Sequence, residues 1–171
     1  MNSIVASQDH GDSLRGIKLT ADMFKPLFVL GKGSFGITIY AEYKEEDGSI
    51  DHFALKYLLK GVVVKTRQLR HVLLERNLLA EMNNPFVMKY HGSFQTSHEL
   101  VIVSECIEGP DLWTIIYDTA PYDKSNGLPF QLSRFYATCI LLGLAHIHER
   151  GVVYRDLKPE NVMTDSSGYA R

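Results

Sequence analysis

The sequence predicts an α+β fold in which a mainly antiparallel sheet with one helix precedes a helical region. Between Phe24 and Glu105, short runs rich in β-branched and aromatic residues alternate with turn-forming residues. One stretch inside this region, residues 66–82, carries apolar residues at helical spacing instead. After Glu105 the apolar spacing becomes mainly helical, interrupted by loops. These three observations place the strands first and most of the helices second.

The composition narrows the class of protein. A chain of 171 residues with 45% hydrophobic residues can form one domain or two small lobes. Its net charge of −2 gives no reason to expect nucleic acid or an anionic membrane as a partner. Cys106 and Cys139 lack metal or disulfide spacing, and neither a signal sequence nor a membrane segment is present. We therefore expect a cytoplasmic protein.

The sheet region is preceded by residues 1–22, which are polar without a sustained period and predict a flexible leader. The helix at residues 66–82 ends before Pro85. The first and second of five predicted strands flank a glycine loop, and the fourth and fifth are joined by a polar turn. The five predicted strands are residues 26–31, 37–44, 51–59, 86–94 and 99–106.

The helical region begins with a short helix at residues 111–118. Residues 119–130 form a loop, because proline, glycine, serine and asparagine interrupt any period. Residues 131–149 have apolar side chains around most of the helix circumference, which predicts a helix buried on several sides. Gly151 is placed to cap its C-terminus.

The glycine loop has the pattern G-x-G-x-x-G at Gly31, Gly33 and Gly36. Dinucleotide-binding folds share this string, but they need a helix directly after it. Here residues 37–39 alternate into a strand, which disfavours an oxidoreductase of that kind. A glycine hairpin lets backbone N–H groups approach phosphates closely, because no Cβ intervenes. A plain hairpin turn is the alternative.

The next strand adds a second signal. Ala54 and Lys56 are two residues apart, so they share one face of a strand. Ala54 is small enough to admit a flat ring, and Lys56 can reach phosphate oxygens. A lysine in an apolar strand is costly unless it is paired, and Glu75 in the following helix is the natural partner. The alternative is that both are solvated surface charges.

Together with "YRDLKPEN" at residues 154–161, these ordered elements resemble the eukaryotic protein kinases over residues 24–171. The resemblance implies a bilobal kinase-like fold, with a five-stranded N-lobe and the first, helical part of the C-lobe. We expect the N-lobe at residues 23–104, the hinge at 105–108 and a partial C-lobe at 109–171. The resemblance to protein kinases also implies ATP and Mg²⁺ as cofactors.

The resemblance assigns roles to single residues. Asp156 would accept the proton of the substrate hydroxyl, Lys158 would neutralise the transferring phosphoryl group, and Asn161 would hold Mg²⁺. Lys56, held by Glu75, would grip the α- and β-phosphates. The residues expected around the nucleotide are Leu30, Gly31, Lys32, Gly33, Ser34, Phe35, Gly36, Ile37, Thr38, Ala54, Lys56, Glu75, Ser104, Glu105, Ile107 and Asp111.

Several residues indicate which group of protein kinases the chain resembles. Lys158 is typical of serine/threonine kinases, and Tyr154 replaces the usual histidine, as in the AGC group. Residues 83–94 and 133–139 are similar to the cGMP-dependent protein kinases. Thr38 stands where valine is usual, a nearly isosteric departure. The chain contains no cyclic-nucleotide-binding domain, so cGMP control is not implied.

The resemblance also implies recognition and regulatory residues. Asp111 and Glu160 are similar to an acidic pair that reads basic residues near the phosphorylated serine or threonine of protein substrates. His71 would sense the phosphate of an activation loop together with Arg155. The alternative for all four is an ordinary surface residue.

The D-F-G motif that carries the main Mg²⁺ ligand in kinases does not occur after the catalytic loop. We therefore expect an N-terminal fragment of a catalytic domain that is inactive alone. A catalytically incompetent nucleotide-binding or docking fragment is the alternative.

Overall fold

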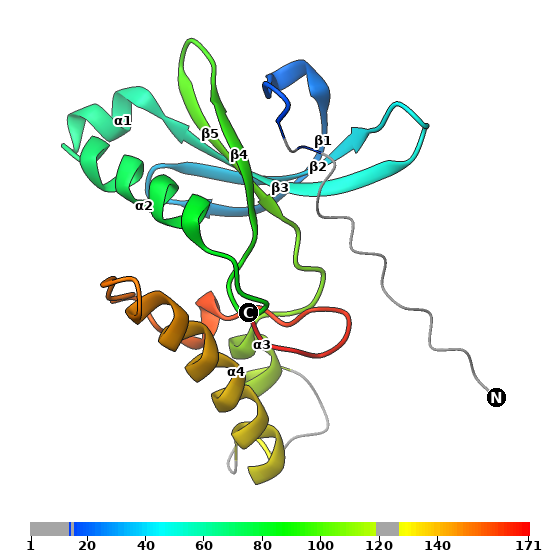
Figure 1. Ribbon diagram of the computed structural model, residues 1–171, viewed down its shortest axis with the longest axis vertical. Coiled ribbons are helices and arrows are strands. Elements are labelled where there is room, and N and C mark those ends of the chain that lie inside the picture. The colour runs from blue at the N-terminus through cyan, green and yellow to red at the C-terminus, as the bar shows by residue number, and fades with distance from the viewer. Residues whose placement is uncertain (1–13, 15, 119–126) are drawn as a thin grey trace. The chain divides into compact units, whose positions relative to one another are not determined.

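The computed structural model describes residues 14, 16–118 and 127–171, so most of the predicted loop at residues 119–130 lies outside the described residues. The chain divides into two compact units (Figure 1). The first unit runs to Ala80 and includes Tyr90–Cys106, and the second comprises Glu81–Lys89 and Ile107–Arg171. Residues 81–89, which we expected in the first lobe, thus cluster with the second unit.

The first unit is built on a sheet of five strands in the order β1-β2-β3-β5-β4, with every neighbouring pair antiparallel. This confirms the predicted α+β class and the five-stranded antiparallel sheet. The predicted fourth strand begins later than expected, at Tyr90 instead of Phe86. The strands are β1 Phe24–Gly33, β2 Gly36–Lys44, β3 Ile50–Leu59, β4 Tyr90–Gln95 and β5 Glu99–Glu105.

Side chains of this sheet alternate between two apolar clusters. The first cluster, on the face that carries Phe53 and Leu55, consists of Leu14, Leu19, Phe24, Ala41, Phe53, Leu55, Val101 and Val103. The second cluster, on the face that carries Lys56, consists of Leu58, Val63, Val72 and Ile102. Lys56 therefore lies on the face that the helices partly cover.

Two helices supply side chains to the second cluster. Helix α1 (Lys60–Lys65) buries Val63 completely, and helix α2 (Leu69–Glu81) buries Val72. Helix α2 matches the predicted helix, whereas α1 was not predicted. Its three successive valines favour a strand in isolation, but burial of Val63 outweighs that preference.

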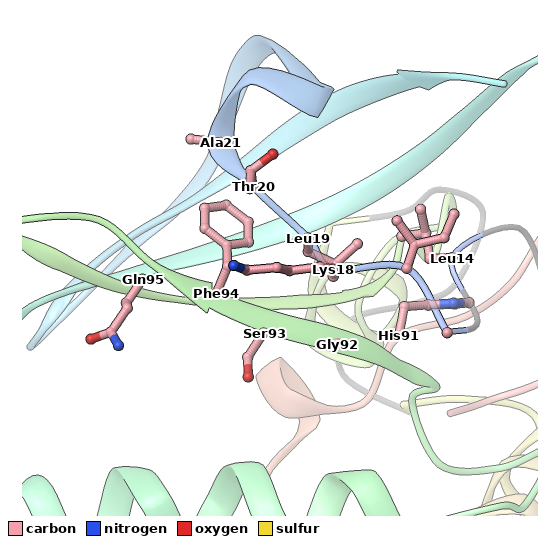
Figure 2. A pocket seen from close by; sticks show the side chains of 12 residues that line it. Leu14, Lys18, Leu19, Thr20, Ala21, His91, Gly92, Ser93, Phe94 and Gln95 are labelled. Carbon is pink, nitrogen blue, oxygen red and sulfur yellow. The ribbon is translucent and has the colours of Figure 1, made fainter. Parts of the chain in front are cut away.

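The end of the expected leader differs from the prediction. Leu14 and Leu19 are buried in the first cluster, and a 3₁₀ turn, η1, covers Ala21–Met23. Leu14 and residues 16–21, here called the N-terminal strap, line a pocket of about 550 Å³ with strand β4 (Figure 2). Two isolated leucines in a polar stretch give no periodic signal, yet they are as well buried as core residues.

The second unit contains helices α3 (Leu112–Tyr117) and α4 (Phe130–His148) and the 3₁₀ turn η2 (Pro159–Asn161). Its core consists of Leu112, Ile115, Tyr136, Cys139, Val162 and Ala170. Gly151 has φ 73° and its N–H donates to the carbonyl of His148, which ends α4 as predicted. Within the described residues, no helix has the length and apolar character needed to span a bilayer.

Helix α4 leaves several of its apolar side chains exposed. Among its residues only Tyr136, Cys139 and Gly143 are buried, and a Cβ on Gly143 would lie 2.8 Å from the carbonyl oxygen of Phe86. Leu141 is 65% exposed, although it is apolar. Gly143 therefore lets one side of α4 approach the segment around Phe86 closely. Apolar side chains elsewhere on the helix, such as Leu141, are exposed to solvent.

Candidate nucleotide and phosphoryl-transfer sites

The glycine loop is a hairpin between β1 and β2, in which Gly33 pairs with Gly36 across a turn at Ser34 and Phe35. Strand β2 starts at Gly36 itself, so the helix that a dinucleotide site requires is absent from this part of the described chain. The strand–glycine–strand arrangement favours a phosphate-covering hairpin over an oxidoreductase site.

The three glycines differ in their surroundings. A Cβ on Gly36 would lie 1.9 Å from the carbonyl oxygen of Tyr57, so this glycine is required by the approach of β2 to β3. A Cβ on Gly31 would meet no atom within 4 Å, and one on Gly33 would meet only the Gly36 oxygen at 4.0 Å. Packing thus explains why residue 36 is a glycine. The backbone at Gly31 and Gly33 has open space beside it, which a phosphate can approach.

Lys56 and Glu75 meet, as the sequence led us to expect. The Nζ atom of Lys56 lies 2.6 Å from Oε1 of Glu75. The two side chains are 42% and 44% exposed, so solvent screens the pair and its contribution to stability is small. Its effect is geometric, because it holds the lysine at a fixed place on the sheet. Thr38 lies directly opposite Lys56 on β2 and shares its face.

Ala54 and Ser104 lie opposite each other on β3 and β5, on the face that carries Lys56. Both are buried, and the Ser104 hydroxyl donates to the Ala54 carbonyl oxygen at 3.4 Å. Beyond Ser104, Glu105 ends β5 and Ile107 begins the second unit's part of the chain. Ile37 is opposite Tyr57, so its side chain is on the other face of the sheet.

The remaining hairpin residues split into two groups. Leu30, Lys32 and Ser34 are exposed. Phe35 instead packs against the second apolar cluster. Sequence reasoning listed all of them as neighbours of the nucleotide and did not foresee that Phe35 points into the unit. A single aromatic residue in a turn gives no sign of its direction.

The catalytic-loop residues gather within the second unit. Asn161 donates from Nδ2 to Oδ2 of Asp156 at 2.7 Å and to the Asp156 carbonyl oxygen at 2.9 Å. Lys158 Nζ lies 3.3 Å from Oδ1 of the same carboxylate. All three residues are exposed. Asp156 is therefore held from both of its oxygens, with the carboxylate still open to a substrate.

The loop is supported on its C-terminal side. Val162 is buried, and its carbonyl accepts from Leu112 N–H at 2.8 Å. The Thr164 hydroxyl donates to the Pro110 carbonyl at 2.7 Å, and a Cβ on Gly109 would lie 2.1 Å from the Thr164 carbonyl oxygen. Sequence reasoning missed this junction, for which the small Gly109 and the buried Thr164 were the only signals.

The predicted recognition and regulatory residues are placed as follows. Asp111 accepts from Thr114 N–H at 2.7 Å and so caps α3, while Glu160 is exposed in η2. His71 lies on α2 one turn before Glu75, and its Nδ1 contacts Gln68. Arg155 has φ 66°, an uncommon backbone conformation for a residue with a side chain. It belongs to the second unit, whereas His71 belongs to the first.

Comparisons with known proteins agree with this geometry. The family model of the protein kinase domain matches residues 24–171. The chain is 35% identical over 173 aligned positions to serine/threonine-protein kinase CBK1 of Pneumocystis carinii, covering all of this chain and 32% of that protein. It is 34% identical to cAMP-dependent protein kinase type 3 of Saccharomyces cerevisiae, covering 90% of this chain and 36% of that protein.

A cGMP-dependent protein kinase of Drosophila melanogaster, isozyme 2 forms cD5/T2, is also 34% identical, over 94% of this chain and 16% of that protein. Kinases of several AGC branches thus match at the same identity. The chain spans about a third or less of the length of these relatives. The prediction of an AGC-type kinase similar to the cGMP-dependent ones is confirmed, and the chain belongs to the protein kinase family.

Proposed function

We propose that the protein transfers the γ-phosphoryl group of ATP to serine or threonine hydroxyls of protein substrates. The observation that carries this proposal is the restraint of Asp156 by Asn161 and Lys158. As the substrate oxygen forms its bond to phosphorus and the bond to ADP breaks, Asp156 takes the hydroxyl proton. Asn161 keeps the carboxylate oriented, and Lys158 offsets negative charge on the phosphoryl group.

The first unit supplies the nucleotide-binding elements. The open backbone at Gly31 and Gly33 would receive phosphate oxygens, and Lys56 would contact the α- and β-phosphates while Glu75 holds it. Ala54 and Ser104, two small residues opposite each other on β3 and β5, would lie beside the adenine ring. The division of the chain between Cys106 and Ile107 supports a hinge at residues 105–108.

The donor set fits Mg²⁺ in part. Because the amide nitrogen of Asn161 is bound to Asp156, its carbonyl oxygen is left to accept a hard cation. No group of three histidine, cysteine, aspartate or glutamate side chains gathers among the described residues. This suits an ion that keeps water and phosphate ligands. When bound, Mg²⁺ would neutralise phosphate charge, and Asn161 would hold it.

We further propose that Asp111 and Glu160 select substrates with basic residues near the acceptor. Glu160 is exposed and beside the catalytic residues in sequence. Asp111 uses one oxygen to cap α3, which fixes the direction of its carboxylate. Two negative charges, of which that of Asp111 is held in place, favour arginine or lysine in the peptide.

Phosphorylation of a serine peptide rich in arginine by the full-length protein tests these proposals. We expect Glu160→Gln to lower kcat/KM for this peptide about tenfold, a loss equivalent to one charge-assisted contact. A peptide with neutral residues at the same positions is the matched substrate, and its kcat/KM should change little. Equal losses on both peptides would contradict the recognition role. Nucleotide binding without any turnover would favour the non-catalytic alternative.

A further inference from the structure

The tip of the glycine hairpin and helix α2 share one apolar cluster. Phe35 packs against the second apolar cluster, whose buried members Leu58, Val63, Val72 and Ile102 come from β3, α1, α2 and β5. All of these residues belong to the first unit. A residue of the phosphate-covering turn therefore lies in the same cluster as the helix that carries Glu75.

Helix α2 has a small buried surface. Val72 is its one buried residue within the described chain. Glu75 follows three positions later, on the same side of the helix. The residue that anchors α2 and the carboxylate that lies 2.6 Å from Lys56 Nζ are therefore on one side of the helix. In Figure 1, α1 comes directly after β3 in the chain, and α2 runs beside the sheet.

The hairpin tip is also attached to β3 through its backbone. Leu59 N–H donates to the Phe35 carbonyl at 2.9 Å. The neighbouring Gly36 leaves no room for a Cβ beside the Tyr57 carbonyl. These contacts fix the backbone on both sides of the aromatic ring, so the ring enters the cluster at a defined place.

We propose that Phe35 is a positioning residue that couples the glycine hairpin to α2 and, through Val72, to the Lys56–Glu75 pair. A hairpin that leaves the cluster removes the ring from Val72, and α2 loses part of its attachment. A hairpin held down by bound phosphate keeps the ring in place. This coupling is a property of the first unit, and its consequence for catalysis rests on the proposed function.

Hydrogen exchange measured without nucleotide tests the coupling. We expect Phe35→Ala to increase exchange of the α2 amides about tenfold, because α2 opens locally more often. Phe35→Leu, which keeps apolar volume, should restore most of the protection. The control is Phe28→Ala, which removes the same side chain from β1, where Phe28 is 55% exposed and stacks on Tyr40 outside the cluster. It should leave α2 exchange unchanged.

Unchanged α2 exchange in Phe35→Ala would overturn the proposal, as would an equal increase in Phe28→Ala. If Phe35→Ala unfolds the chain, the graded pair Phe35→Leu and Phe35→Val decides on the same amides, with more exchange expected for valine. The measurement needs no ATP, so its failure is distinct from failure of the proposed function.

A kinetic readout then connects the coupling to catalysis. In the full-length protein, Phe35→Ala should raise KM for ATP about tenfold and lower kcat less, because phosphate binding depends on Lys56 and the hairpin. Phe35→Leu should return KM close to the wild-type value. A fall in kcat with KM unchanged would contradict positioning through Lys56.

Discussion

The candidate site of the first unit and that of the second unit fix their side chains in different ways. In the first unit, Thr38, Lys56 and Ser104 are placed by strand register, and one ion pair to Glu75 adds the final restraint. In the second unit, Asp156 lies in an irregular loop and is held by two side chains within five residues of it. The strand register is maintained by many backbone hydrogen bonds, whereas the geometry of the loop depends on a few side-chain contacts.

The difference suggests how each half should respond to substitution. A single substitution in the sheet should change the stability or the local shape of the first unit more than it changes one functional contact. The reason is that many neighbouring residues together hold each side chain in position. A single change in the catalytic loop should alter chemistry with little effect on folding, because the three loop residues are exposed. Four substitutions test this contrast.

The largest effect is expected from Asp156→Asn in the full-length protein. The amide cannot accept the hydroxyl proton, so kcat should fall by about 10³-fold while the dissociation constant for ATP changes little. Steady-state kinetics and a nucleotide-binding titration measure the two quantities. An equally large loss of ATP affinity would show that the loop is not independent of the nucleotide.

A matched pair of glycine substitutions tests the sheet side. Gly36→Ala should destabilise the first unit by about 3 kcal/mol, because its Cβ would lie 1.9 Å from the Tyr57 oxygen. Gly33→Ala meets almost no atom, so it should leave stability unchanged and weaken nucleotide binding instead. Urea unfolding with and without nucleotide separates these outcomes. Similar stability losses in both variants would contradict the distinction between the glycines.

The smallest effect is expected at Ser104, which immediately precedes the predicted hinge. The serine is small and lies opposite Ala54, so it would obstruct a bulky ATP-competitive inhibitor less than a larger side chain at this position. Ser104→Met should weaken such inhibitors by about 1–2 kcal/mol through steric overlap. Inhibition constants of one bulky and one compact compound measure this. If both compounds lost affinity equally, a general distortion of the sheet would explain the result better.

Much of the fold could be predicted because local signals agree with tertiary structure. Alternation of residues gave the strands, and helical spacing gave α2 and α4. The pairing of Lys56 with Glu75 followed from the cost of an unpaired lysine in an apolar strand. In these cases the pattern within a few residues already specifies which side chains point inward.

The unpredicted features depend either on tertiary packing or on the direction of single side chains. Helix α1 has the valines of a strand, and only the space around Val63 makes it helical. The turn at Phe35 and the restraint of Asp156 by Asn161 depend on side-chain direction, which no periodicity encodes. Residue types identified candidates for the site, but the structure was needed to show which ones meet.

The N-terminal strap has a practical consequence for anyone who shortens this protein. The match to the kinase family begins at residue 24, and a gene trimmed there would lose Leu14 and Leu19. Phe24, Phe53 and Phe94 lie in or against the cluster that these leucines complete. Removing two buried leucines forfeits about 1.5–3 kcal/mol each. The packed part of the first unit thus extends at least about ten residues before the start of its recognisable sequence signature.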